Sequence, residues 1–399
     1  MKKILVITTF NNHFHFFRRL QNVLKQFQYE THFLTNKYSI IREAGEANLI
    51  IEPFEKDVTS SNEIEVENSF EVAANFIDRK LAINIANVVW NKLESCFSEF
   101  DYEYIFMWGG VRLIEHTTSI FASKNNIKTL FFELGNFPNK IFVDSKGTNA
   151  RSYLAANPSV LLSLPYDLSS FNKWKNNYIQ ESLKQHSVPQ SKSAVNVEYS
   201  KNVYDLIGFS IKNFLKTEPI LTKEKLVGKY LRNFIKLNFD EIDILKTNYI
   251  FFPMQVNKDA QLILNSKVGN LKALEIANQL ANEKGLKLLV KPHPGEVEFG
   301  FIKKVNKLKE KLGFAFVNNN TIELIQYAKE VITINSTVGL QAKILNKKIT
   351  CLGKSFYQDF DEQMLAAYIQ SYLIDADFWN ESTIPIETVE QIFERAKLN

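Results

Sequence analysis

GLKLLVKPHP (residues 285–294) and VITINSTVGL (residues 331–340) decide the fold of this chain. In each stretch a short apolar run stops at a polar loop, and helical patterns stand on both sides, as expected for buried strands of a parallel sheet. Working outward, further strands are predicted at residues 249–252, 314–317 and 349–352, and helices at residues 270–283, 301–312, 322–329 and 339–345. This alternation predicts a Rossmann-like domain over residues 244–375.

The first half of the chain shows the same alternation less regularly. Apolar runs predict strands at residues 3–8, 31–34, 104–107 and 128–132, and amphipathic patterns predict helices near residues 15–27, 70–91 and 115–124. We therefore expect a second Rossmann-like domain over residues 1–170.

Two further segments complete the expected architecture. Residues 171–243 are rich in Lys, Asn and Ser and carry two amphipathic helical patterns with basic faces. They predict a helical insertion that either packs between the domains or touches an anionic membrane. Residues 376–399 predict a C-terminal helix that returns towards the N-terminal domain, with Pro385 in its first turn, where a missing N–H costs nothing. We therefore expect an α/β protein with two Rossmann-like domains facing a cleft (GT-B-like). Nucleotide-sugar transferases share this arrangement, but the arrangement alone does not identify a reaction.

Composition excludes several classes of protein. The 399 residues are 45% hydrophobic, so disorder is not expected, and 48 basic against 44 acidic residues do not suggest a nucleic-acid binder. The two cysteines, Cys96 and Cys351, form no CxxC pair, which fits a reducing compartment. No apolar run is long enough for a membrane span or a signal peptide. A cytoplasmic protein is therefore predicted, with a possible site on the inner face of the inner membrane.

The loop Lys291-Pro292-His293-Pro294 follows the predicted strand at residues 287–290. Its two prolines end the strand and fix a rigid loop that presents His293. A histidine at the carboxyl end of a strand can donate to a phosphate or act as a general acid, although a lone histidine is more often structural. The position between the prolines favours a function.

A second loop, from Asn335 to Gly339, follows the predicted strand at residues 331–334 and opens a helix. Hydroxyls of Ser336 and Thr337 beside the free backbone N–H groups of a helix start form an anion site, and the alternative is a simple helix cap. Together the two loops predict a site for a nucleotide phosphate. No glycine-rich loop is present, so ATP and NAD are not indicated.

Two carboxylates follow strands in the two halves of the chain. Asp259 lies in QVNKDAQ (residues 255–261), and Glu133 lies in FELGNFP (residues 132–138). Paired carboxylates from facing domains suit glycosyl transfer, whereas a helix cap and a solvated loop group are the alternatives. No Asp-x-Asp metal motif occurs, so neither a metal nor another cofactor is predicted.

These motifs, in this order, resemble the capsule polysaccharide biosynthesis family of bacterial β-Kdo transferases. The resemblance extends in patches over residues 129–357 and is most specific in NSTVGLQAKILNKKITCLGKSFY (residues 335–357). It implies transfer of Kdo from CMP-Kdo to a glycan or glycolipid acceptor, with retention of configuration, in capsule or lipopolysaccharide biosynthesis. Residues 1–128 and the insertion do not share this resemblance, so the resemblance implies no particular acceptor.

The resemblance also implies roles for individual residues. Asp259 would be the nucleophile that forms a Kdo–enzyme adduct, Glu133 the acid/base, and His293, with Ser336 and Thr337, the group that holds the CMP phosphate. Further donor-binding candidates are Gln255, Lys291, Pro294, Asn335 and Gly339. Candidates on the sugar or acceptor side are Asn136, Asp144, Asn149, Arg151 and Tyr357.

Three other functions stay open at the level of sequence. Sialyltransferases that use CMP-sialic acid and glycerophosphotransferases that use CDP-glycerol carry similar His-Pro motifs. A noncatalytic glycan- or lipid-binding subunit of an export complex is a third possibility, although such a subunit would not need Asp259, His293 and Ser336 together.

Overall fold

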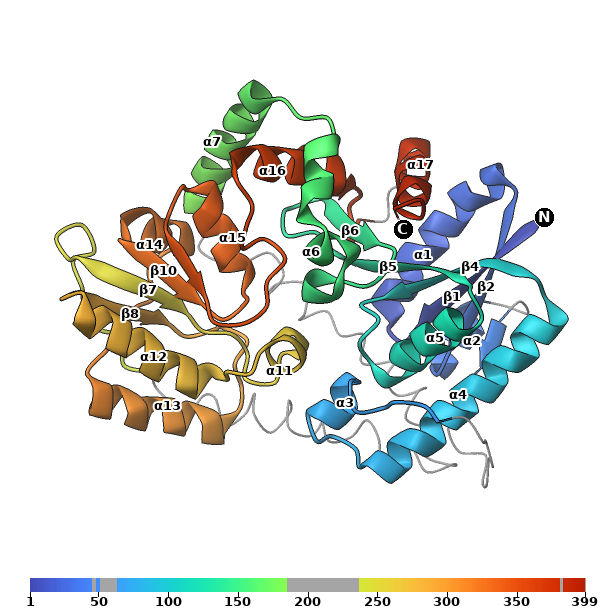
Figure 1. Cartoon of the computed structure of the whole chain (residues 1–399), viewed down its shortest axis with the longest axis horizontal. Helices are drawn as coiled ribbons and strands as arrows, with labels where there is room; N and C mark the ends of the chain where they lie inside the picture. The colour runs from blue at the N-terminus through green and yellow to red at the C-terminus, as the bar shows by residue number, and fades with distance from the viewer. Residues whose placement is uncertain (45–47, 51–62, 185–236, 381–382, 399) are drawn as a thin grey trace. The chain divides into compact units, whose positions relative to one another are not determined.

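The computed structural model describes residues 1–44, 48–50, 63–184, 237–380 and 383–398 (Figure 1). The chain divides into two compact units. Among the described residues, unit 1 holds Met1–Asn157 and the C-terminal segment from Ser371, and unit 2 holds the residues from Pro158 to Gln370. Most of the predicted insertion at residues 171–243, including both basic helical patterns, lies outside the described residues.

Unit 1 contains a seven-stranded sheet with the strand order β12-β6-β5-β4-β1-β2-β3. Strands β1 to β5 run parallel, while β6 pairs antiparallel with both β5 and β12. The strands are β1 (Lys2–Thr8), β2 (Tyr29–Thr35), β3 (Asn48–Ile50), β4 (Tyr102–Trp108), β5 (Lys128–Leu134), β6 (Lys140–Asp144) and β12 (Ile374–Asp375). The central strands read as nearly continuous apolar runs because helices cover both faces of the sheet.

Helices cover each face of the unit 1 sheet. Side chains of α1 (Asn11–Leu24) and α17 (Ile386–Arg395) share one buried apolar cluster with the sheet, and those of α4 (Arg79–Glu99) and α5 (Leu113–Lys124) share the other. The short elements of this unit are η1 (Lys25–Phe27), α2 (Tyr38–Ala44), α3 (Phe70–Ala73), η2 (Asn149–Arg151) and α6 (Tyr153–Ala156). The sheet and its two helical layers thus form a complete Rossmann-like unit.

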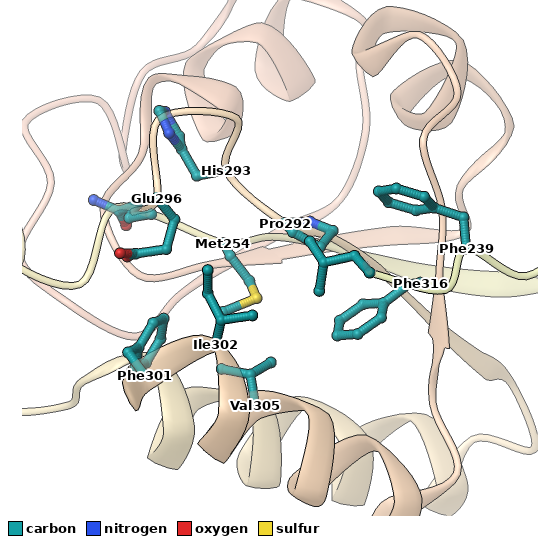
Figure 2. A pocket seen from close by; sticks show the side chains of 11 residues that line it. Phe239, Met254, Pro292, His293, Glu296, Phe301, Ile302, Val305 and Phe316 are labelled. Atoms are coloured by element: carbon teal, nitrogen blue, oxygen red, sulfur yellow. The ribbon is translucent and has the colours of Figure 1, made fainter. Parts of the chain in front are cut away.

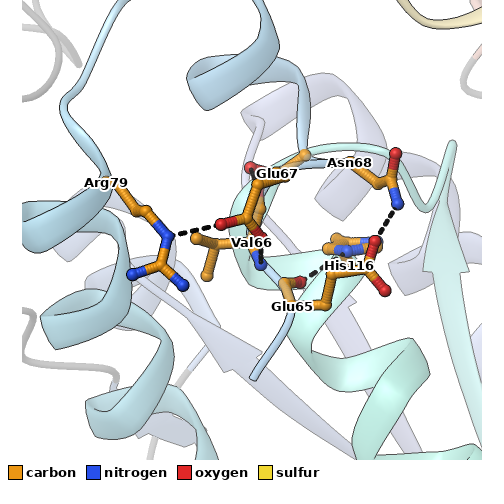
Figure 3. Close-up of polar contacts among 7 residues, drawn as sticks. Glu65, Val66, Glu67, Asn68, Arg79 and His116 are labelled. Carbon is orange, nitrogen blue, oxygen red and sulfur yellow. Dashed lines mark hydrogen bonds and ion pairs between the residues drawn. The ribbon is translucent and has the colours of Figure 1, made fainter. Parts of the chain in front are cut away.

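The segment that precedes α3 is tied to α4 and α5 by polar contacts (Figure 3). The His116 ring on α5 lies 3.0 Å from the carbonyl oxygen of Glu65, and the Arg79 guanidinium on α4 binds the Glu67 carboxylate. Helix α3 itself is tied to α5 by Glu71, whose carboxylate accepts the Leu113 N–H at 2.8 Å and so caps the start of α5. This segment therefore lies against the N-terminal end of α5.

Unit 2 contains a five-stranded parallel sheet with the order β11-β10-β7-β8-β9. The strands are β7 (Tyr249–Pro253), β8 (Lys287–Lys291), β9 (Ala315–Phe316), β10 (Glu330–Thr333) and β11 (Ile349–Cys351). The order reverses between β7 and β10, so the switch point of this doubly wound sheet lies between those two strands.

Helices α12 (Asn270–Glu283) and α13 (Phe299–Leu312) cover one face of this sheet, and α14 (Thr321–Tyr327) and α15 (Thr337–Ile344) cover the other (Figure 1). The remaining elements are η3 (Pro158–Ser163), α7 (Leu168–Lys184), α11 (Ala260–Asn265), α16 (Glu362–Ala367) and the π-helical turn η5 (Tyr368–Tyr372). No helix among the described residues has both the length and the apolar character to cross a membrane.

The predicted α/β class with two Rossmann-like sheets is confirmed. The antiparallel strand β6 was not predicted, and its turn depends on Gly135. The Gly135 N–H donates to the Lys140 carbonyl at 2.8 Å, and a Cβ on Gly135 would lie 2.5 Å from that same oxygen. Only glycine permits such a close approach, which lets the chain reverse directly after β5. The placement of the two units around a cleft stays a prediction.

Candidate functional site

The carboxyl edge of the unit 2 sheet brings three predicted motifs together. QVNKDAQ follows β7, KPHP follows β8 and NSTVG follows β10, and these three strands are neighbours in the sheet. Because the carboxyl ends of parallel strands meet at one edge, the three loops share that edge, and the loops after β7 and β10 flank the switch point at which such sheets bind ligands.

Hydrogen bonds between two amide side chains connect two of these loops. Gln255, only 8% exposed, donates from Nε2 to Asn335 Oδ1 at 2.9 Å and accepts the Asn335 N–H at 3.1 Å. Asn335 Nδ2 in turn donates to the Gln261 carbonyl at 2.9 Å. Gln255 and Asn335 were predicted to bind the donor, and the structure places these polar atoms in contacts between loops. They form a rigid frame for the site.

His293 lies at the exposed tip of the KPHP loop. Its Nδ1 atom lies 3.0 Å from the Gly295 nitrogen and accepts that N–H. The neutral ring therefore carries its proton on Nε2, which makes Nε2 the hydrogen-bond donor. A Cβ on Gly295 would lie 3.1 Å from Nδ1, so the absence of a side chain there keeps the ring in place. Pro294, between the two, is exposed.

Asp259 is the N-cap of α11, and its Oδ1 accepts the Gln261 N–H at 2.7 Å. Burial raises the pKa of this carboxyl, while backbone hydrogen bonds and the charge of His293 act in the opposite direction. Asp259 therefore caps α11, as the helix-cap alternative predicted. Asp259 follows β7 and His293 follows β8, so the two residues lie on loops of neighbouring strands at the same edge of the sheet.

Ser336 caps α15, and its hydroxyl oxygen accepts the Val338 N–H at 3.2 Å. Thr337 is the first residue of that helix. Below them Tyr357, predicted on the sugar or acceptor side, is 1% exposed and donates its hydroxyl to the Ser336 carbonyl. A Cβ on Gly339 would lie 2.5 Å from the Tyr357 hydroxyl oxygen. Gly339 and Tyr357 therefore support the anion loop from inside and lie out of reach of a ligand.

Lys291 has a similar supporting position. Its Nζ donates to the Asn319 carbonyl at 2.7 Å and to the Thr321 hydroxyl at 3.0 Å, and burial lowers its pKa. These contacts fix the connection between β9 and α14 to the end of β8. Lys291 thus has a structural role, and its role in donor binding stays a prediction.

An apolar pocket of about 290 Å³ opens beside His293 (Figure 2). Its polar wall consists of Gln255, His293 and Glu296. Glu296 is only 8% exposed, and its carboxylate accepts the Asn257 and Glu298 N–H groups at 2.7 and 2.8 Å. The other lining residues are Leu237, Phe239, Met254, Pro292, Phe301, Ile302, Val305 and Phe316. Because Gln255 both lines the pocket and binds Asn335, the pocket adjoins the anion loop. Sequence reasoning missed Glu296, for which the spacing from KPHP was the only signal.

In unit 1, Glu133 lies at the carboxyl end of β5. Its Oε1 accepts the Leu134 N–H at 3.0 Å, and its Oε2 would lie 4.0 Å from a Cβ on Gly109. Gly109 and Gly110, directly after β4, both have φ of +75°, a conformation that favours glycine. A tight glycine turn therefore passes close to the Glu133 carboxylate.

Asp144, predicted on the acceptor side, is 1% exposed, and its carboxylate accepts hydrogen bonds from residues of unit 1. Its oxygens accept the Tyr372 hydroxyl at 2.8 Å and the backbone N–H groups of four residues, namely Lys146, Gly147, Tyr153 and Leu154. It therefore organises the loop after β6, and the prediction that it contacts a ligand is not supported by its burial.

The other three acceptor-side candidates lie near that loop or the turn before it. Asn149 has a left-handed φ of 53°, and the Arg151 guanidinium donates to the Asn68 carbonyl at 3.3 Å. Asn136 follows Gly135 in the β5–β6 turn and is partly exposed. Among the described residues, no group of three or more His, Cys, Asp or Glu side chains could hold a metal ion.

Comparisons with known proteins add the following findings. A family model described as "Capsule polysaccharide biosynthesis protein" matches residues 103–360. Protein FixF of Sinorhizobium fredii is 32% identical over 127 residues, which is 31% of this chain and only 30% of that relative's length.

Two solved structures of Thermosulfurimonas dismutans KpsC are similar at low identity. The β-Kdo 2,7-transferase is 15% identical, with a TM-score of 0.46 over 100% of this chain and 99% of the other. The β-Kdo 2,4-transferase is 14% identical, with a TM-score of 0.40 over 74% and 87%. The UDP-GlcNAc 2-epimerase of Methanocaldococcus jannaschii is 10% identical, with a TM-score of 0.34 over the full length of both chains.

Proposed function

The chain belongs to the capsule polysaccharide biosynthesis protein family, and from this premise we propose that it transfers Kdo from CMP-β-Kdo to a glycan or glycolipid acceptor with retention of configuration. The observation that supports the proposal is that Asp259, His293 and the Ser336 loop follow three neighbouring strands at one edge of the unit 2 sheet. A cytoplasmic location, at the inner face of the membrane, remains a prediction.

The donor phosphate is proposed to lie between His293 and the start of α15. The His293 Nε2–H and the hydroxyl groups of Ser336 and Thr337 at the start of α15 are donors that suit an anion, and the helix dipole adds to the attraction. The apolar pocket beside His293 is proposed to take the nucleobase, because a flat ring with apolar faces fits a cavity lined by methionine, phenylalanine and isoleucine.

The proposed reaction has two displacements. The Asp259 carboxylate attacks the anomeric carbon, the bond from that carbon to the phosphate oxygen breaks, and CMP leaves with the electron pair. Glu133, as the proposed acid/base, then removes the proton of an acceptor hydroxyl, whose oxygen displaces Asp259 from the sugar. Each step inverts the anomeric carbon, so the product keeps the configuration of the donor.

Donor binding tests this proposal directly. Titration calorimetry on the full chain should show binding of CMP and CMP-Kdo, and CMP should be released slowly from CMP-Kdo without an acceptor. CMP-sialic acid, CDP-glycerol and a UDP-sugar form the comparison set. Tight binding of the UDP-sugar together with none for CMP would overturn the proposal, and turnover of CMP-sialic acid or CDP-glycerol alone would replace Kdo by that donor.

A further inference from the structure

Helix α13 presents a ridge of lysines on its outer side. Lys303, Lys307 and Lys311 recur every four residues and are exposed, and Lys304 lies beside them. Phe301, Ile302 and Val305 face the other way and are buried against the sheet. Side chains four apart lie on one face of a helix, so the lysine ammonium groups form a continuous row.

Within the described part of the chain, most of the positive charge of this row is not paired with an acidic side chain. The helix has five lysines and one glutamate, Glu310, which leaves a net charge of +4. Lys309 binds Asp240 at 2.6 Å and so belongs to the packing of unit 2. Within the part of the chain that the structure describes, the other four lysines have no hydrogen bond or ion pair, and a row of like charges without partners is unfavourable in an isolated unit.

The neighbouring helix on the same face of the sheet lacks this feature. In α12 one lysine, Lys272, pairs with Glu275 at 3.0 Å, and a second glutamate, Glu283, gives the helix a net charge of −1. The basic row is therefore a property of α13 and not of the whole face.

One exposed aromatic side chain stands at the start of the lysine row. Phe299, the first residue of α13, is 40% exposed and lies four residues before Lys303, on the same side of the helix. An exposed phenylalanine beside a lysine row is typical of surfaces that lie at a lipid interface, where the ring enters the headgroup region and the lysines meet anionic phosphates.

We propose that the outer face of α13, with Phe299 at its start, binds the surface of an anionic lipid bilayer. Each lysine near such a surface strengthens binding by about fivefold, the equivalent of about 1 kcal/mol. The proposal does not depend on the identity of the sugar donor, because it concerns a face of unit 2 and is measured without donor.

Co-sedimentation of the full chain with vesicles tests the proposal. Vesicles of phosphatidylcholine with about one third phosphatidylglycerol should retain the protein at low salt, and pure phosphatidylcholine vesicles should not. At about 1 M salt, where the Debye length falls to about 3 Å, binding should weaken strongly. Replacement of Lys303, Lys304, Lys307 and Lys311 by Gln should reduce the partition coefficient by about 100-fold or more. Phe299→Ser should reduce it at both salt concentrations.

A matched control removes the same charge elsewhere in unit 2. Four exposed lysines are replaced by Gln in that control, at Lys173, Lys246, Lys267 and Lys287. Its partition coefficient should change by no more than a few fold, and both quadruple variants should keep the wild-type circular dichroism spectrum. Equal loss in the two variants would overturn the proposal, as would the absence of wild-type binding to anionic vesicles. Binding to polygalacturonate without binding to vesicles would assign the face to an acidic glycan instead.

Discussion

One backbone hydrogen bond determines the tautomer of the neutral His293 ring. Because the Gly295 N–H is donated to Nδ1, a neutral His293 must offer Nε2–H, which is the form that can bind a phosphate oxygen. Because the His293 ring is exposed, it should contribute little to the stability of the fold.

Loss of the His293 ring should therefore reduce turnover and leave the fold intact. We expect His293→Ala to lower the rate of CMP release by about 10²–10⁴-fold, the usual effect of removing a general acid or a charge-stabilising donor. The measurement is a steady-state rate beside a thermal melt. A rate close to that of the wild type would make His293 a structural residue.

Asp259 should be found joined to the sugar when no acceptor is present. Incubation with CMP-Kdo should add the mass of one Kdo to the peptide that contains Asp259, and Asp259→Asn should abolish that adduct. Burial raises the pKa of Asp259, and only the ionised carboxylate attacks, so adduct formation should slow as the pH falls through that raised value. A product with inverted configuration, detected by NMR, would exclude the nucleophile.

The sequence could predict the loops of the site but not how their polar atoms are used. The spacing of KPHP and NSTVG correctly predicted strand ends, because apolar runs and prolines act locally. The side chains of Gln255, Lys291 and Tyr357 are of types that often bind ligands. Only the tertiary structure reveals that they already form hydrogen bonds with Asn335, Asn319 and Ser336, respectively. Contacts between distant residues leave no periodic signal in one sequence.

At the scale of elements, the first turn of α15 is fixed by the fit between Gly339 and Tyr357. A Cβ on Gly339 would approach Tyr357 Oη to 2.5 Å and Cε2 to 2.8 Å, closer than any normal contact. The buried ring cannot retreat, because Tyr357 is only 1% exposed. The loop that presents Ser336 and Thr337 thus depends on this contact.

Gly339→Ala should loosen α15 and weaken donor binding. Overpacking of this kind typically costs about 1–3 kcal/mol, and hydrogen exchange should become faster in peptides from the start of α15. Tyr357→Phe removes the oxygen at 2.5 Å, so Gly339→Ala should cost less in that background. A double-mutant cycle measures the destabilisation by Gly339→Ala in the wild type and in Tyr357→Phe. Equal values would show that the contact with the Tyr357 hydroxyl is not what requires glycine at position 339.

Glu115 in α5 gives unit 1 a stability that depends on pH. It is 1% exposed, accepts the Thr9 hydroxyl at 2.8 Å, and burial raises its pKa to about 7. An unfolded glutamate ionises near 4.3, so the stabilisation is complete below that pH and is lost as the pH rises towards about 7.

The urea midpoint of unit 1 should accordingly fall between about pH 4.5 and about pH 7. The linkage amounts to about 3 kcal/mol over this range. Tryptophan fluorescence is a suitable probe, because Trp90, Trp108 and Trp379 lie in unit 1. Glu115→Gln should be less stable at low pH and should lack this slope. An unchanged slope in the variant would assign it to other groups.

At the scale of the whole molecule, the described residues of unit 1 come from two pieces of chain that are far apart in sequence. Val389 and Ile392 of α17 are fully buried in the cluster that α1 and the sheet share, and β12 extends the sheet beyond β6. The alternation of strands and helices predicted both sheets, and the C-terminal helix was predicted to return towards the N-terminal domain. Strand β12 was not predicted, because its pairing with β6 joins residues more than 200 positions apart in the sequence.

Truncation of one α17 side chain should affect unit 1 and spare unit 2. Ile392→Ala leaves a cavity in a closed core and should cost about 2–4 kcal/mol. The fluorescence midpoint should fall, while calorimetry should give a wild-type CMP affinity, because the proposed donor site lies in unit 2. A parallel loss of CMP affinity would show that the two units are energetically coupled.

The division of unit 1 between the two chain segments also determines the order of events during synthesis. The ribosome releases β1 to β6 first, then all of unit 2, and only afterwards β12 and α17. For that interval the nascent first unit presents the apolar side of α1 without the helix that covers it. Unfinished domains with such surfaces are targets for chaperones and prone to aggregation. Translation of the intervening residues takes roughly ten to forty seconds at bacterial rates, long enough for a chaperone to bind this intermediate.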